Sequence, residues 1–177
     1  MAIDPAFSLL ALLLLAVVFG LAAFLKLRDL EVFAAVVEQY RLLPAKLVRP
    51  FAYALPVVEL VAVLGLLWPT TRGAAAAVLI LLLLAFAAAM AVNLARGRSD
   101  IDCGCFVGPH KQRISWPLVL RNLVLAGMGA GLLAEPTGRA LTALDGFTVA
   151  VATLSLLLLN EAIGRLFGLA LASRRTA

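Results

Sequence analysis

Charged side chains are scarce in this sequence. Its 177 residues include only 15 lysines and arginines and 10 aspartates and glutamates, while 64% of the residues are apolar and the mean hydropathy is +1.06. Ordinary water-soluble domains contain about 45–50% apolar and about 25% charged residues. A soluble fold of this composition would leave too much hydrocarbon in water. The composition therefore excludes a separate soluble domain and predicts an integral membrane protein.

The excess of positive charge does not indicate a nucleic-acid-binding protein. The formal net charge is +5, but the basic residues occur in short clusters beside the apolar runs. Clusters in these positions are typical of membrane topology, because lysine and arginine flank the spans. We therefore expect a lipid bilayer, and no nucleic acid, among the partners.

Long apolar runs predict about five transmembrane helices. A span needs roughly 20 apolar residues, and runs without strand-like alternation can satisfy their backbone groups in lipid only as helices. Short links between the runs predict antiparallel neighbours. The fold class is therefore all-α, a polytopic membrane protein with a four-helix-bundle core in a single domain, residues 1–177. The predicted spans are 6–25, 51–68, 74–95, 117–134 and 141–160.

Two further segments lie between the predicted spans. Residues 30–43 place apolar side chains at helical spacing opposite polar ones, which predicts an amphipathic helix at the membrane interface. We expect Pro44 and Pro50 to bracket the exit from this helix. Residues 96–115 form a polar loop that contains both cysteines and the only histidine.

The distribution of lysine and arginine predicts which links share a side of the membrane. The first link, in which we count Lys26, the third link and the C-terminal tail are basic, whereas the other links contain only Arg72 and Arg139. Because basic loops stay in the cytoplasm, this distribution predicts an outside N-terminus and a cytoplasmic cysteine loop.

The only two cysteines, Cys103 and Cys105, are separated by Gly104 alone. Two thiols this close can form a small strained ring, and strained disulfides have high reduction potentials that make them labile and catalytic. Gly104 gives the backbone the freedom that such a ring requires. The pair is therefore the candidate catalytic site. Incidental thiols in a small-residue turn and lipidation of a juxtamembrane cysteine are less favoured alternatives.

His110 extends the cysteine motif to C-x-C-x4-H, a set that could hold Cu(I) or Zn(II). The set lacks a clear fourth ligand, for which Asp100 and Asp102 are the nearby candidates. A soft-metal binding or transport protein that uses Cys103, Cys105 and His110 is thus the alternative function. If His110 serves the thiols instead, we expect it to carry protons.

Four other polar residues are candidates for supporting roles. Glu59 falls near the middle of a span, where a carboxylate is costly, so we expect it to face the bundle and to be protonated or paired. A structural hydrogen bond and a redox-linked proton role are both open for it. Asn93 is placed to hydrogen-bond across the bundle. Arg121 could snorkel to the headgroups or serve as the partner of a thiolate or quinone. Asp102 would oppose ionisation of the neighbouring thiol, which the basic residues of the loop would favour.

Three features of the chain together are typical of one family. They are the Asp-Cys-Gly-Cys-Phe run at 102–106, the segment 55–59 that begins with Leu-Pro and ends at Glu59, and the spacing of the spans. On these features the sequence resembles the methylamine-utilisation (MauE) family, within the MauE/DoxX-like group of redox-associated membrane proteins. The resemblance covers most of the chain, and the cysteine motif is its specific part.

The resemblance implies a role in disulfide chemistry during the maturation of a periplasmic enzyme, in the bacterial inner membrane. It also implies a membrane-anchored or periplasmic thioredoxin-like partner and a disulfide-rich client, such as the small subunit of methylamine dehydrogenase. Roles are carried over for Cys103 and Cys105 only. The architecture is also analogous to that of quinone-coupled disulfide oxidases, which makes a quinone a candidate cofactor. A non-catalytic scaffold for the thioredoxin-like partner is a third class of function. A periplasmic role conflicts with the predicted cytoplasmic loop unless electrons cross the bilayer.

Overall fold

A computed structural model describes residues 3–104, 112–134 and 139–173, with side chains described as far as residue 158 and at residue 162. Within these residues the chain is almost entirely helical, which confirms the predicted all-α class. The elements are α1 (Pro5–Arg28), α2 (Leu30–Tyr40), α3 (Ala45–Leu66), α4 (Pro69–Ala95), α5 (Trp116–Ala130), the short 3-10 helix η1 (Gly131–Leu133) and α6 (Ala143–Ser173).

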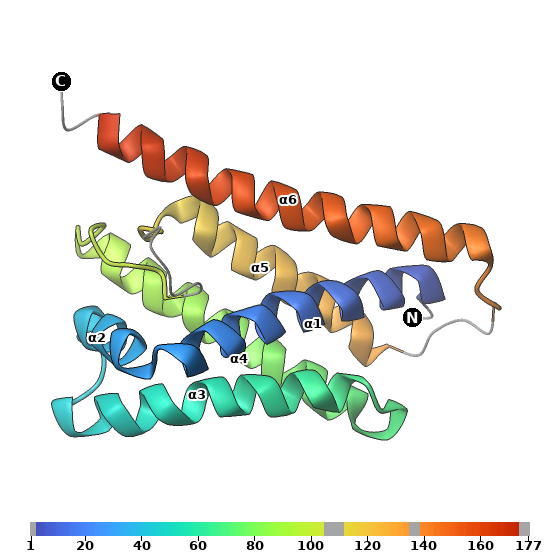
Figure 1. The fold of residues 1–177 in the computed structure, drawn as a ribbon, viewed down its shortest axis with the longest axis horizontal. Coiled ribbons are helices and arrows are strands. Elements are labelled where there is room, and N and C mark those ends of the chain that lie inside the picture. The colour runs from blue at the N-terminus through green and yellow to red at the C-terminus, as the bar shows by residue number, and fades with distance from the viewer. Residues whose placement is uncertain (1–2, 105–111, 135–138, 174–177) are drawn as a thin grey trace.

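Helices α1, α3, α4 and α5 form a bundle, and each, with η1 extending α5, is long and apolar enough to cross a membrane. Helix α1 packs against α3 and α5, and α4 packs against α3 and α5. The largest buried cluster draws residues from all four helices, among them Leu15, Leu66, Leu79 and Leu125. This arrangement confirms the predicted four-helix-bundle core. Helix α6 lies along the outside of the bundle against α1 (Figure 1), and its stretch Ala143–Leu158 is apolar but shorter than the four candidate spans.

Two helices begin earlier than the apolar runs predict. Helix α3 begins at Ala45, so Pro50 does not mark the exit from the preceding helix as predicted, and Pro50 and Pro56 both lie inside α3. Proline in the second turn removes only one helical hydrogen bond, and packing in the bundle offsets that loss. Helix α4 begins at Pro69 rather than residue 74, because proline is well suited to the first helical position.

The segment between the first two bundle helices differs slightly from the predicted interfacial helix. Helix α2 ends at Tyr40 instead of residue 43, because Arg41 has a left-handed backbone with φ of 49°. Only Asp29 separates α2 from α1. Helix α2 packs on α3 at the end of the bundle where the α4–α5 connection also lies (Figure 1). This end of the molecule contains the cysteine motif.

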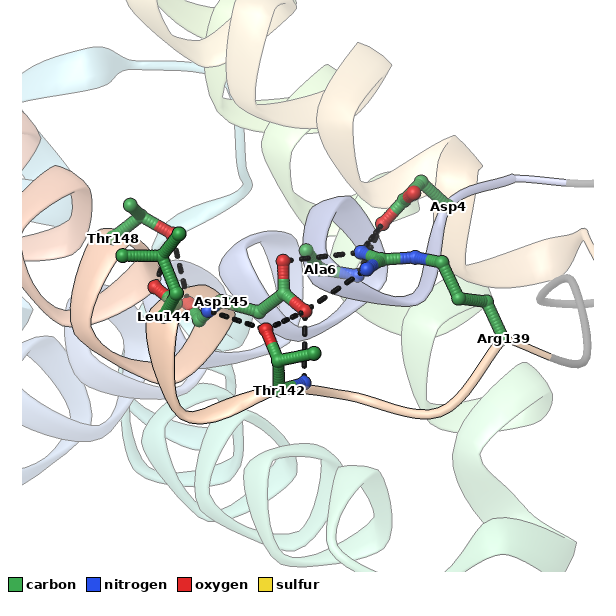
Figure 2. Close-up of polar contacts among 7 residues, drawn as sticks. All are labelled: Asp4, Ala6, Arg139, Thr142, Leu144, Asp145 and Thr148. Carbon is green, nitrogen blue, oxygen red and sulfur yellow. Dashed lines mark hydrogen bonds and ion pairs between the residues drawn. The ribbon is translucent and has the colours of Figure 1, made fainter.

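An ion-pair network lies at the opposite end of the bundle (Figure 2). Arg139 contacts Asp4 at 3.1 Å and Asp145 at 3.0 Å. Thr142 and Asp145 exchange hydrogen bonds between side chain and backbone, which caps the start of α6. The carboxylate of Asp4 accepts a hydrogen bond from the backbone N–H of Ala6, and this bond, with that from Arg139, lowers the pKa of Asp4. The network joins the start of α6 to the start of α1.

Candidate functional site

The cysteine loop contains two arms that pair with each other. The backbone N–H of Cys103 donates to the carbonyl of Gln112 at 2.7 Å, and that of Ile114 donates to the carbonyl of Ile101 at 2.9 Å. These bonds form an antiparallel bridge between Asp102 and Arg113. The pairing satisfies buried backbone groups of the loop, so it fixes the position of Cys103 relative to α4 and α5.

Cys103 is buried within an apolar cluster. It is 9% exposed and packs with Ile101 and Ile114 of the two arms, Met90 of α4 and Leu118 of α5. Two polar contacts are also present. The Sγ atom lies 3.8 Å from Oε1 of Gln112, and the hydroxyl of Tyr40 donates to the Cys103 carbonyl at 3.3 Å. The thiol therefore has an apolar environment and donates a weak hydrogen bond to an amide oxygen.

Gly104 is required by both its backbone conformation and its surroundings. Its φ is +70°, in the left-handed region that disfavours other residues. A Cβ atom at this position would lie 3.0 Å from Val36 Cγ1 and 3.4 Å from Phe33 Cε2, both on α2. Its N–H donates to Oδ1 of Asp102 at 3.2 Å, so the aspartate supports the turn. The cysteine motif therefore lies directly against α2.

Arg98 connects the loop to the end of α2. Its guanidinium donates to the backbone carbonyls of Gln39 at 2.7 Å and Tyr40 at 3.4 Å, which are carbonyls left unpaired by the end of the helix. It also donates to Oδ1 of Asn93 at 2.8 Å. Asn93 is fully buried and donates to the carbonyl of Ala89 on its own helix. Asn93 therefore reaches α2 through Arg98 instead of hydrogen-bonding directly to another helix.

Lys26 and Glu59 form a buried ion pair between α1 and α3. The Nζ and Oε1 atoms are 2.5 Å apart, and the side chains are 2% and 0% exposed. Nζ also lies 5.2 Å from the ring centroids of Phe33 and Phe86, within cation–π range. Counting Lys26 as a charge of the first link was therefore wrong. Helix α1 continues to Arg28, so Lys26 lies on a helical face that packs on α3, where the buried carboxylate needs a counter-charge.

One sequence signal would have found this pair. Glu59 is an acid within an apolar helix, and Lys26 is a base at the end of another, so the two are natural partners in a low-dielectric interior. Sequence reasoning considered each residue separately and attributed Lys26 to membrane topology.

An apolar pocket of about 270 Å³ lies between the first four helices and the cysteine loop. Most of the described residues in its wall are aliphatic or aromatic, and Lys26 is the only charged one among them. Cys103 and Gly104 line it from the loop. The remaining lining residues are Phe33, Val36, Val37, Tyr40, Leu42, Leu43, Phe51, Leu55, Leu82, Ala85, Phe86 and Ala89. Lys26 and Cys103 therefore line one cavity, which we call the Lys26 pocket.

The remaining candidate residues are not brought into this cavity by the described part of the chain. Cys105 and His110 lie outside the described residues. Arg121, on α5, has buried Nε and Nη1 atoms and is not among the described residues that line the Lys26 pocket, and both of its predicted roles stay predictions. Among the described residues no three histidine, cysteine or acidic side chains are grouped as for a metal ion. Since two members of the set Cys103, Cys105 and His110 lie outside the described residues, the metal alternative stays a prediction.

The chain is similar in sequence to known proteins. Residues 4–135 match the family described as methylamine utilisation protein MauE. Three proteins with that name are similar to the chain. The relative from Paracoccus versutus is 48% identical over 120 residues, which is 68% of this chain and 64% of the relative. The relative from Methylophilus methylotrophus is 42% identical over 134 residues, which is 75% of this chain and 70% of the relative. The relative from Methylorubrum extorquens is 49% identical over 111 residues, which is 63% of this chain and 60% of the relative.

The matched region thus spans between 60% and 70% of the length of these relatives. No solved structure matches the chain. The family match extends from the start of α1 to just beyond η1, and it includes every residue that lines the Lys26 pocket as well as the whole cysteine loop.

Proposed function

Because the chain belongs to the MauE family of methylamine utilisation proteins, we propose that it is a membrane thiol–disulfide redox protein that acts through Cys103 and Cys105. In this proposal it works in the bacterial inner membrane with a thioredoxin-like partner. It assists disulfide formation in a periplasmic client, such as the disulfide-rich subunit of methylamine dehydrogenase.

The observation that carries this proposal is the position of the cysteine motif. The paired arms hold Cys103 against the end of the bundle, and Gly104 next to it has the left-handed backbone that lets the chain turn between the two cysteines. A loop that had only to connect α4 to α5 would not need a glycine in contact with Val36 and Phe33. The structure therefore favours a built site over an incidental pair of thiols.

The exchange proceeds through a mixed disulfide. To oxidise the partner, a partner thiolate attacks the disulfide of the cysteine pair, so one S–S bond breaks and a mixed S–S bond forms. The second partner thiolate then attacks the mixed disulfide, which leaves the partner oxidised and the pair as two thiols. Because Cys103 is buried, we assign the mixed disulfide to Cys105 and make Cys103 the thiolate that leaves when the partner attacks. The exchange is reversible, and when the Cys105 thiolate attacks a disulfide of the oxidised partner, Cys103 is the thiol that resolves the mixed disulfide.

Two serine substitutions test this function and this assignment. Cys103→Ser and Cys105→Ser should each abolish maturation of the client, measured as methylamine dehydrogenase activity, while membrane insertion is retained. Cys103→Ser should accumulate a mixed disulfide with the thioredoxin-like partner, seen in non-reducing electrophoresis and identified by mass spectrometry, and Cys105→Ser should not. Ala95→Ser, at an exposed position at the end of α4, is the matched control.

Three results would change the proposal. Full client maturation in both cysteine variants would refute the redox function. Accumulation of the mixed disulfide in Cys105→Ser would reverse the roles of the two cysteines. Stoichiometric Cu(I) or Zn(II) in the wild type, lost in both variants together with activity, would replace the redox function by metal binding through Cys103, Cys105 and His110.

The side of the membrane that holds the cysteine motif follows from the charges at that end. The links at this end retain an excess of lysine and arginine even without Lys26, against Arg72 and Arg139 at the other end, which supports a cytoplasmic position. A membrane-impermeant maleimide should then label the reduced thiols in inverted vesicles and not in intact spheroplasts. Labelling in spheroplasts would instead mean that the pair exchanges directly with a periplasmic partner and that no electron needs to cross the bilayer.

A further inference from the structure

We propose that the Lys26 pocket binds the head group of a lipid-soluble para-quinone, and that this quinone accepts the electrons of the reduced cysteine pair. The inference rests on the proposed thiol–disulfide function, because that function leaves the pair reduced and in need of an oxidant. It assigns a ligand class and a binding site to the cavity, and a role to Lys26.

The size and the mouth of the pocket fit a substituted ring. An engineered apolar cavity of about 150 Å³ holds benzene, so a cavity of about 270 Å³ can hold a ring with its substituents and the start of a tail. Leu42 and Phe51 line the pocket and are each 42% exposed, so apolar side chains reach from the cavity to the outer surface of the bundle. A ligand dissolved in the bilayer can therefore enter without crossing a polar barrier.

The buried ammonium selects a quinone from among apolar ligands. Lys26 has three N–H donors and uses one hydrogen bond on Glu59, while the rings of Phe33 and Phe86 flank the same nitrogen. A quinone carbonyl can accept one of the other donors, and its ring can pack against the phenyl groups. The ammonium also stabilises the negative charge that develops on the carbonyl oxygen during reduction. A lipid acyl chain would make no use of this donor.

The electron balance requires no other oxidant. The two thiols lose two electrons and two protons, both S–H bonds break, and one S–S bond forms between the cysteines. The quinone gains two electrons and two protons, so its two C=O groups become the two C–OH groups of a quinol. Cys103 lines the pocket, which places one of the reacting sulfurs at the wall of the quinone site.

A pair of substitutions on α4 tests the site without changing any charge. Ala89→Phe would fill the pocket, whereas Ala88→Phe, one residue away, adds the same side chain at an exposed position that does not line it. The full chain in lipid nanodiscs is titrated with decylubiquinone, and binding is measured by ultrafiltration. We expect the wild type and Ala88→Phe to bind one quinone per chain, and Ala89→Phe to bind at least tenfold more weakly.

The role of Lys26 is tested with a variant that leaves no orphan charge. In the double variant Lys26→Gln/Glu59→Gln both charges are removed while hydrogen-bonding groups remain. Loss of a charge-assisted hydrogen bond to the carbonyl should weaken decylubiquinone binding by about tenfold or more. Unchanged affinity in this variant would remove Lys26 from the site.

A second measurement separates this inference from the proposed function. Pre-reduced wild type should convert decylubiquinone to the quinol, and the change in ultraviolet absorbance measures this conversion. Cys103→Ser should bind the quinone without reducing it. Absence of binding to the wild type, or equal binding to Ala89→Phe, would overturn the quinone site even if the cysteines exchange with the thioredoxin-like partner. Full client maturation by Cys103→Ser alongside normal quinone binding would instead overturn the thiol function and leave the site.

Discussion

The buried ion pair between Lys26 and Glu59 leads to a quantitative prediction about stability. Removing one member of a buried pair leaves an uncompensated charge and costs about 3–5 kcal/mol, whereas replacing both by apolar residues of similar volume is often neutral or stabilising. The pair is well suited to this test, since its atoms are 2.5 Å apart and both side chains are at most 2% exposed. We therefore expect Lys26→Met and Glu59→Leu each to destabilise the bundle strongly, and the double variant to recover most of the loss.

The surroundings of the pair predict which single variant is worse. In Glu59→Leu the ammonium keeps the faces of Phe33 and Phe86, which are worth up to about 2 kcal/mol each when desolvated, so the loss should lie near 3 kcal/mol. In Lys26→Met the carboxylate of Glu59 loses the ammonium and has no comparable attraction to a ring face, so the loss should lie near 5 kcal/mol. Glu59→Gln keeps an acceptor for Lys26 and should cost less than Glu59→Leu.

The assay is equilibrium unfolding of the purified protein by SDS in mild detergent micelles, followed by tryptophan fluorescence. Arg49→Met is the control, because the Arg49–Glu31 pair is 3.5 Å long with side chains 74% and 68% exposed, and an exposed pair contributes at most about 1 kcal/mol. The reasoning is refuted if Lys26→Met is no worse than this control, or if the double variant is less stable than either single one.

Two further predictions concern the two ends of the bundle. Gly104→Ala should lower the free energy of unfolding by about 1–2 kcal/mol, because φ of +70° strains any other residue and Val36 Cγ1 would lie 3.0 Å from the new Cβ. A variant as stable as wild type in the same SDS titration would contradict the described turn. At the other end, the pKa of Asp4 is lowered below its ordinary value of 3.8, so the stability it contributes is present above pH 3.8 and is lost as the pH falls through the folded-state pKa. Asp4→Asn should flatten that acid limb of the stability profile, and an unchanged acid limb would contradict the Arg139 network.

Hydropathy alone was sufficient to predict the bundle, because backbone groups in lipid leave no alternative to helices. The helix boundaries were less predictable, for a physical reason visible at the α3–α4 turn. The hydroxyl of Thr71 donates to the carbonyl of Gly65 at 2.7 Å, and Arg72 donates to that of Leu66 at 3.2 Å. These polar side chains satisfy the last carbonyls of α3 from within the first turn of α4, so a helix begins where composition indicates a loop.

The geometry of the cysteine loop could not be predicted from the sequence, because it depends on contacts between distant segments. The motif itself was found from the spacing of the two thiols. The arm that pairs with Cys103 comes from Gln112, and the support for the loop comes from Arg98 acting on the end of α2. Neither contact has a local sequence signal, since a loop arginine is usually solvated or bound to headgroups. Only the folded chain shows that Arg98 spans the gap between Asn93 and Tyr40.

The two segments that make the sequence resemble its family meet in one place. The segment 55–59 contributes Leu55 to the wall of the Lys26 pocket and Glu59 to the ion pair with Lys26. The run at 102–106 contributes Cys103 and Gly104 to the wall of the same cavity. A carboxylate that served only to join α1 to α3 could lie anywhere along their contact. Its position beside a cavity that also contains a cysteine fits the proposed redox function, because a charge buried there would act on the electrons that enter or leave the thiols.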